Sequence, residues 1–123
     1  MTREILKFRA WDGLNKKMSF WTMNDLCNHT NDSEKPSCLE EWMQFTGLLD
    51  KNGKEIYEGD IITYGFKTKD FNDLVLHTGK IFFNEYMFLV DGDKVNDEWH
   101  SINRIHYVEV IGNIYENPEL LSN

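Results

Sequence analysis

The alternation of polar and apolar side chains predicts that the chain begins as a β-hairpin. Within the run Ile5–Trp11, Lys7 and Arg9 alternate with apolar residues, which is the period-two pattern of a strand with one buried face. A glycine-containing turn at 12–13 separates this run from a second strand-like run, Met18–Met23. The order of strand, turn and strand indicates a hairpin whose apolar side chains face the core.

Five further runs are rich in β-branched and aromatic residues, as is typical of strands. These runs are Trp42–Thr46, Ile61–Phe66, Leu74–Phe83, Tyr86–Val90 and His106–Tyr115. Turn-forming residues separate them at intervals of roughly eight to twelve residues. Asp50–Lys54 is the strongest turn signal, and Gly79 within its run indicates a bulge. We therefore predict one mostly β domain over residues 1–123, a small antiparallel β-barrel or sandwich with short helical turns.

The remaining segments are predicted to be loops or single helical turns. The polar segment Asn24–Pro36 is expected to be a mobile surface loop. One short helical turn is expected near Leu39–Glu41. Together with the loop, it would form a flexible connection over residues 24–41. Other short connections are predicted at Glu55–Asp60, as a loop, at Trp99–Ile105, as a turn or short helix, and at Asn117–Leu121, as a closing helical turn with Pro118 in its first position.

The composition indicates a folded, acidic domain. Aromatic residues make up 14% of the 123 residues, and their rings supply enough apolar area to offset the entropy of ordering. The net charge is −8, and residues 84–123 carry two basic side chains against eight acidic ones. A duplex-binding domain usually carries a basic stripe, and none is visible here. The acidity instead favours solubility, a cationic partner, or no charge-driven partner.

Nothing in the chain predicts a membrane or secreted protein. No apolar run approaches the ~18 residues of a membrane helix, and no signal-peptide pattern is found at the start of the sequence. We therefore expect a cytoplasmic protein. In that compartment Cys27 and Cys38 would be reduced thiols.

Three segments stand out together: KFRAWD at 7–12, MQFTGLLDKNGKEIYEGDI at 43–61 and VEVIGNIYENPELL at 108–121. In this order and spacing these signature segments resemble the YopX family of phage and prophage proteins. The resemblance covers essentially the whole chain, and its last segment is the most specific. It implies an all-β fold and a phage or prophage setting. It supplies no catalytic residue and no cofactor.

Four acidic residues form the most site-like constellation: Asp50, Glu55, Glu58 and Asp60. Carboxylates that converge near a glycine turn can bind a divalent cation or carry out acid–base chemistry. These four also fit ordinary turn and loop-closure chemistry, their spacing does not match a calcium loop, and no histidine lies nearby. We therefore favour a structural role and predict no metal and no cofactor.

Two cysteines and a histidine suggest a zinc site, but their spacing is unfavourable. Structural zinc sites favour two ligand pairs, each with two to four residues between its ligands. Cys27 and His29 are too close in sequence, and Cys38 has no second ligand beside it. A fourth ligand would have to come from His77, His100 or His106. We favour a loop with incidental thiols, and no motif for a nucleophile or a phosphate loop is present.

The tryptophans are candidates for an interaction surface. The chain has more aromatic rings than a small β domain can bury, and the four candidates are Trp11, Trp21, Trp42 and Trp99. Exposed rings can stack on the bases of single-stranded nucleic acid, but such sites are normally lined by lysine and arginine. Aromatic residues are also enriched at protein interfaces, which fits an acidic protein better.

These observations favour a non-enzymatic phage or prophage accessory protein that binds another protein or assembles with itself. The protein partner would be a second copy, a host protein or a phage protein. A small-barrel nucleic-acid-binding protein is the alternative, because Gly59–Ile62 has the form of a loop-to-strand junction in such barrels. A divalent-cation-dependent enzyme built on the acidic residues between 50 and 60 ranks third.

Overall fold

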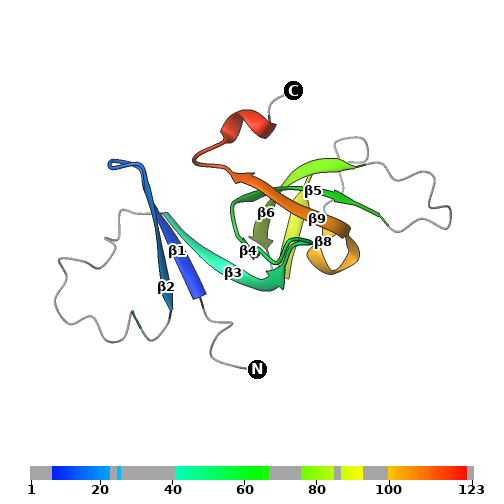
Figure 1. Ribbon diagram of the computed structural model, residues 1–123, viewed down its shortest axis with the longest axis horizontal. Coiled ribbons are helices and arrows are strands. Elements are labelled where there is room, and N and C mark those ends of the chain that lie inside the picture. The colour runs from blue at the N-terminus through cyan, green and yellow to red at the C-terminus, as the bar shows by residue number, and fades with distance from the viewer. Residues whose placement is uncertain are drawn as a thin grey trace.

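The protein contains two antiparallel β-sheets that meet along one side (Figure 1). The computed structural model describes residues 7–22, 25, 41–66, 76–84, 87–92 and 100–121. The strand order is β2-β1-β3-β4 in the first sheet and β8-β7-β6-β5-β9 in the second. In the described part of the chain neither sheet closes on itself, so the arrangement is sandwich-like. The predicted mostly β fold is confirmed, as a sandwich-like form instead of a barrel.

The first sheet is built around the predicted hairpin. Its strands are β1 (Lys7–Asp12), β2 (Lys17–Thr22), β3 (Glu41–Leu49) and β4 (Glu55–Tyr57). Arg9 of β1 lies opposite Phe20 of β2 and opposite Met43 of β3. Directly opposed residues of an antiparallel pair point to the same side of a sheet. These three side chains therefore share one face of the first sheet.

The second sheet has β5 in its interior. Its strands are β5 (Asp60–Gly65), β6 (His77–Asn84), β7 (Met87–Asp91), β8 (His100–Ser101) and β9 (His106–Asn113). Because β5 is hydrogen-bonded to both β6 and β9, all of its residues except Thr63 are buried. The 3₁₀ helix η3 (Ile102–Arg104) connects β8 to β9, and η4 (Pro118–Leu121) lies beyond β9.

Gly59 holds the connection between the two sheets. Only Glu58 and Gly59 separate β4 from β5. The Gly59 N–H donates to the Ile81 carbonyl at 2.8 Å, and the Gly59 carbonyl accepts from the Ile114 N–H at 2.9 Å. Its φ of 83° lies in the left-handed region that glycine adopts without strain. The first sheet is thus fixed against the second within two residues.

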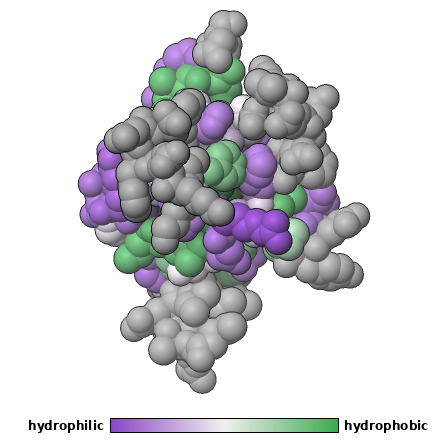
Figure 2. Space-filling model, turned by 90° about the vertical axis from the view of Figure 1, so that its right-hand side faces the viewer, coloured by the Kyte–Doolittle hydropathy of each residue, from purple (hydrophilic) through white to green (hydrophobic). Residues whose placement is uncertain are grey.

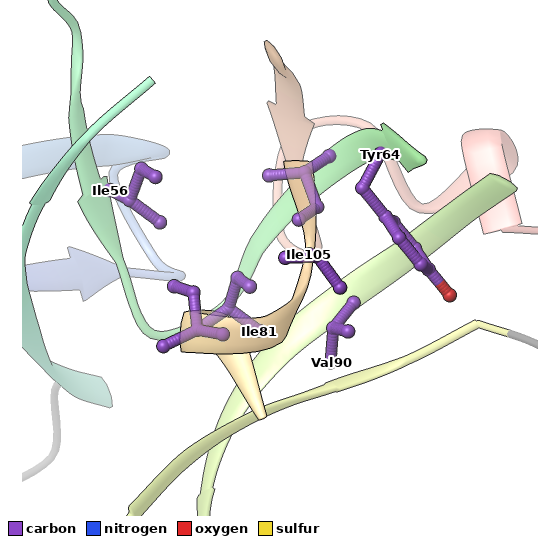
Figure 3. Packing of buried hydrophobic residues seen from close by; sticks show 7 residues of the cluster. Ile56, Tyr64, Ile81, Val90 and Ile105 are labelled. Atoms are coloured by element: carbon purple, nitrogen blue, oxygen red, sulfur yellow. The ribbon is translucent and has the colours of Figure 1, made fainter. Parts of the chain in front are cut away.

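The main core lies on the second sheet and includes one residue of the first. The buried cluster consists of Ile56, Ile62, Tyr64, Ile81, Val90, Ile102 and Ile105 (Figure 3). Ile56 comes from β4 and is 1% exposed, so the last strand of the first sheet contributes to this core. Burying an aliphatic side chain of this size stabilises the fold by about 1.5–3 kcal/mol. The packing of Ile56 therefore helps to hold the two sheets together.

The predicted strands are confirmed, and two short strands, β4 and β8, were not predicted. Each predicted run contains a strand, and the closing helical turn is present as η4. Glu55–Asp60 was expected to be a loop, but it contains β4, because Ile56 reaches the core and its neighbours pair with β3. The segment 99–105 contains β8 and η3. The predicted loop 24–41 lies outside the described residues except for Asp25 and Glu41.

Candidate functional site

A cleft of about 480 Å³ lies where the two sheets meet. Its walls come from both sheets and from the turn that follows β9. The lining residues are Arg9, Met18, Phe20, Lys54, Glu55, Tyr57, Asp60, Val110, Ile111, Gly112, Asn113, Glu116 and Asn117. Apart from Met18 and Phe20, all of them belong to the signature segments 7–12, 43–61 and 108–121. The three segments are thus far apart in the sequence and converge on one cleft.

A buried ion pair forms the floor of the cleft. The Arg9 Nη2 lies 2.8 Å from Asp60 Oδ1, and the two side chains are only 7% and 2% exposed. Nη2 also donates to the Glu58 carbonyl at 3.0 Å, and Nε donates to the Met43 sulfur at 3.4 Å. The guanidinium lies 4.8 Å from the centroid of the Tyr57 ring. Asp60 Oδ2 in turn accepts from the Tyr57 N–H at 2.8 Å.

Burial controls the electrostatics of this floor. It raises the pKa of Asp60 above its ordinary value of 3.8, while the positive charge of Arg9 acts in the opposite direction. Burial and the nearby Glu55 carboxylate raise the pKa of Tyr57 to about 12. Tyr57 therefore stays protonated near neutral pH and acts as a hydrogen-bond donor. The floor is suited to binding through hydrogen bonds and apolar contact.

Phe20 lies at the rim of the cleft and is the most exposed ring near it. It is 62% exposed, and its ring makes an edge contact with Tyr57 at a centroid distance of 5.8 Å. A second hollow of about 260 Å³ lies next to the cleft. Phe20, Glu55 and Tyr57 line both hollows, so Phe20 stands at their common border.

The far wall is a turn built by two asparagines. The Asn113 side-chain oxygen accepts from the N–H groups of Tyr115 and Glu116 at 3.0 and 2.8 Å. The Asn117 side-chain oxygen accepts from the Asn113 N–H at 3.2 Å. A Cβ atom at Gly112 would lie only 2.6 Å from this Asn117 oxygen, so a glycine is needed there. The most specific signature segment thus encodes the turn that closes one end of the cleft.

Asp50, the first of the four predicted acidic candidates, has a structural role. One carboxylate oxygen accepts from the N–H groups of Asn52 and Lys54, both at 2.9 Å, and the other accepts from the Val110 N–H at 2.9 Å. Burial alone would raise the pKa of Asp50, but these three hydrogen bonds outweigh it and lower the pKa below 3.8. Asp50 thereby fastens the 50–54 turn to β9.

The other acidic candidates are also engaged. Glu55 forms an ion pair with Lys7 and accepts a hydrogen bond from the Tyr57 hydroxyl at 3.2 Å. The Glu58 carboxylate accepts from the Gln44 N–H at 2.9 Å. Glu55 and Asp60 line the cleft, whereas Asp50 and Glu58 do not. Among the residues that the structure describes, no group of three or more histidine, cysteine, aspartate or glutamate side chains is arranged to hold a metal ion.

The three described tryptophans are not gathered on one surface. Trp11 is 8% exposed and stacks on Tyr115 at a centroid distance of 5.8 Å, so it lies in the interior and not on an exposed face. Trp21 is half-buried and Trp42 is 38% exposed. Trp21 lines the second hollow together with Phe20 and Tyr57. Trp42 directly precedes Met43, so its side chain points to the opposite side of the strand from Met43. Trp99 lies outside the described residues.

The zinc hypothesis concerns residues that are mostly beyond the described part. His77 and His100 both pack against the ring of Phe66, at centroid distances of 5.7 and 4.7 Å, and His106 is exposed. The three candidates outside the described residues are Cys27, His29 and Cys38.

Sequence reasoning missed the two residues that define the cleft. The alternation in β1 placed Arg9 opposite the apolar face, yet Arg9 is 6% exposed. The expectation was wrong because the side of β1 that carries Arg9 faces the second sheet, where Asp60 neutralises it. Phe20 was read as an ordinary strand residue. An arginine in the middle of a signature segment was the available signal.

In comparisons with known proteins, a family model described as YopX protein matches residues 7–122. The crystal structure of protein EF1440 from Enterococcus faecalis is similar, with a TM-score of 0.54 and 28% sequence identity. That similarity covers 94% of this chain and 97% of the other. No curated protein matches. Within the described residues, no helix has the length and apolar character needed to span a membrane.

Proposed function

The chain belongs to the YopX protein family, and on this premise we propose that it is a non-enzymatic protein-binding module. It takes an extended segment of a partner protein into the cleft between its two sheets. We place it in a phage or prophage setting, where it acts in the host cytoplasm on a host or phage protein.

The exposed Phe20 ring at the border of the two hollows carries this proposal. Phe20 is 62% exposed, so more than half of its apolar surface faces water. An apolar side chain of a bound partner would cover this surface and remove it from water, which is favourable. Contact with the buried Tyr57 holds the ring in place, so little entropy is lost when a partner binds. Phe20 therefore has the properties of an interface anchor.

The size and walls of the cleft favour an extended segment over a folded domain. Hollows of about 480 and 260 Å³ hold a few side chains each. The strands β4 and β9 are both at the edge of their sheets, and both contribute residues to the cleft. Sheet edges commonly bind extended peptides as an added strand.

On the side of the molecule shown in Figure 2, the described hydrophobic residues form separate patches among hydrophilic ones.

The state of the acidic residues supports a binding role. Asp50, Glu55, Glu58 and Asp60 each accept hydrogen bonds or pair with a cation within the protein. Two of these groups, Glu55 and Asp60, line the cleft and are thereby held in place within it.

The test compares Phe20→Ala with Leu14→Ala. Leu14 is 91% exposed in the β1–β2 turn and does not line the cleft, so it is a matched control on the same hairpin. Tagged wild-type protein is used to capture partners from host cells that carry the phage, and each captured protein is titrated against the three forms. We expect Phe20→Ala to weaken binding by tenfold or more and Leu14→Ala to leave it unchanged. A partner that binds both variants equally well, or no partner at all, contradicts the proposal. Light scattering identifies the case in which the partner is a second copy.

A further inference from the structure

We propose that Arg9 recognises main-chain carbonyl groups of the bound segment, so that the cleft selects an uncharged extended peptide over a free anion. This inference rests on the binding function proposed above and names the chemistry of its ligand.

The guanidinium of Arg9 is only partly satisfied by the protein. The Nε–H donates to Met43, and Nη2 donates to Asp60 and to the Glu58 carbonyl. These bonds account for three of its five N–H groups. The two N–H groups of Nη1 have no hydrogen-bond partner in the described part of the chain. Arg9 is only 6% exposed, and it lines the cleft.

Nη1 opens into the cleft. His100 Nε2 is an example of a side-chain atom that is fully enclosed and has no hydrogen-bond partner. Arg9 Nη1 is not enclosed in this way, so it reaches the surface of the cleft that Arg9 lines. A donor on a charged group that is nearly out of water costs free energy when it lacks a hydrogen-bond partner. A ligand oxygen at Nη1 would recover this free energy.

The geometry of the free donors favours single carbonyl oxygens. An arginine binds a carboxylate through two parallel N–H groups. The two nitrogens are either Nη1 and Nη2 or Nε and Nη2, so Nη2 takes part in both arrangements. In this protein Nη2 already serves Asp60 and Glu58. Nη1 therefore offers two diverging single bonds, which suit the carbonyl groups of a peptide main chain.

The charge of the site points the same way. Asp60 offsets the charge of Arg9 at 2.8 Å, and Lys7 forms an ion pair with Glu55 at the rim. Of the other charged lining residues, Lys54 and Glu116 have opposite signs. No net positive charge is left over to attract an anion into the cleft.

Small probes test this inference without knowledge of the partner's sequence. N-methylacetamide is a single peptide group, and acetate has a similar size but carries a negative charge. Each is titrated into the full-length protein at constant ionic strength, and inorganic phosphate serves as a second anion. The readout is the side-chain ¹⁵N–¹H signal of Arg9 by NMR, with the exposed Arg104 as an internal control. The backbone amide signals of Ile111 and Gly112 report occupancy of the cleft independently.

We expect N-methylacetamide to shift the Arg9 Nη1 signal and to slow its hydrogen exchange several-fold, with no change at Arg104. Acetate and phosphate are expected to require at least tenfold higher concentrations for the same shift. Equal or stronger effects of the anions would overturn the inference in favour of an anion site. Shifts at Ile111 and Gly112 without any at Arg9 would also overturn it, and so would no shift at all. Leu14→Ala, which lies outside the cleft, should keep the Arg9 response. The small probes do not depend on the partner, so loss of partner binding in Phe20→Ala remains a separate test of the binding function.

Discussion

Arg9 and Asp60 form an ion pair that links the first strand of one sheet to the first strand of the other, with 2.8 Å between Nη2 and Oδ1. Both groups are almost fully buried, so each depends on the other for its charge to be compensated. The pair is therefore a structural tie as well as the floor of the cleft.

Breaking this pair from one side should be strongly destabilising. We expect Arg9→Met and Asp60→Asn each to lower the free energy of unfolding by about 3–5 kcal/mol, because each leaves an uncompensated buried group. The double variant should lose clearly less than the sum of the two losses. Urea unfolding of the four forms measures this. Lys51→Met is the control, since Lys51 and Glu109 are exposed and 3.8 Å apart, and it should cost less than about 1 kcal/mol. Additive losses for Arg9 and Asp60 would show that the pair is not coupled.

Asp50 should make the stability of the protein depend on pH in the acid range. Its pKa is below the ordinary 3.8 in the folded protein, so the unfolded chain binds a proton more readily than the folded one. The stability that Asp50 supplies is therefore fully present above 3.8 and is lost as the pH falls through the lower folded value.

Asp50→Asn tests this dependence. The amide keeps one acceptor but loses the second, so we expect a loss of about 1–3 kcal/mol at neutral pH. The difference between wild type and variant should shrink below pH 3.8. Asp60 has a raised pKa and acts in the opposite direction, but its effect is common to both proteins and cancels in the difference. Glu109→Gln, on the same strand as Val110, is the control and should cost less than about 1 kcal/mol at neutral pH, because its ion pair with Lys51 is 3.8 Å long and open to solvent. A gap between wild type and Asp50→Asn that stays constant down to pH 2 would contradict the prediction.

Gly59 and Gly53 offer a matched pair of substitutions. Both have φ values in the left-handed region, 83° and 82°, so alanine at either position carries a backbone cost of about 1–2 kcal/mol. A Cβ at Gly53 meets nothing within 4 Å, whereas one at Gly59 lies 2.9 Å from the Met43 sulfur. Met43 is buried and accepts a hydrogen bond from Arg9, so it cannot move freely. Thermal unfolding should therefore show a larger loss for Gly59→Ala than for Gly53→Ala, and equal losses would mean that Met43 yields at no cost.

Gly112 and Asn117 should be coupled through one contact. Gly112→Ala places its Cβ against the Asn117 side chain and forces that side chain away from the Asn113 N–H. Once Asn117→Gly has removed the whole side chain, including the Cβ that would lie 2.9 Å from the new one, Gly112→Ala should cost little more. We expect a coupling energy of about 1–2 kcal/mol in a double-mutant cycle followed by chemical unfolding. Independent effects would show that the turn adopts another arrangement.

The strands could be predicted because their signals are local. Alternation in β1 and the Asn52-Gly53 turn depend on neighbouring residues only. The site could not be predicted in this way, because Arg9 changes from a solvent-facing to a buried residue only through Asp60, on another sheet. β4 was missed for the same reason, since the core position of Ile56 depends on strands that follow it in the chain. The family resemblance indicated which segments matter but not where they meet.

The convergence of three distant segments on one cleft has a consequence for how the protein is made. During synthesis the hairpin that carries Arg9 and Phe20 leaves the ribosome before β5, and the wall formed by β9 and the Asn113–Asn117 turn leaves after it. Arg9 meets its carboxylate only after the first sheet has been completed and β5 has started. A nascent chain therefore has no complete cleft until β9 and the turn that follows it have been made.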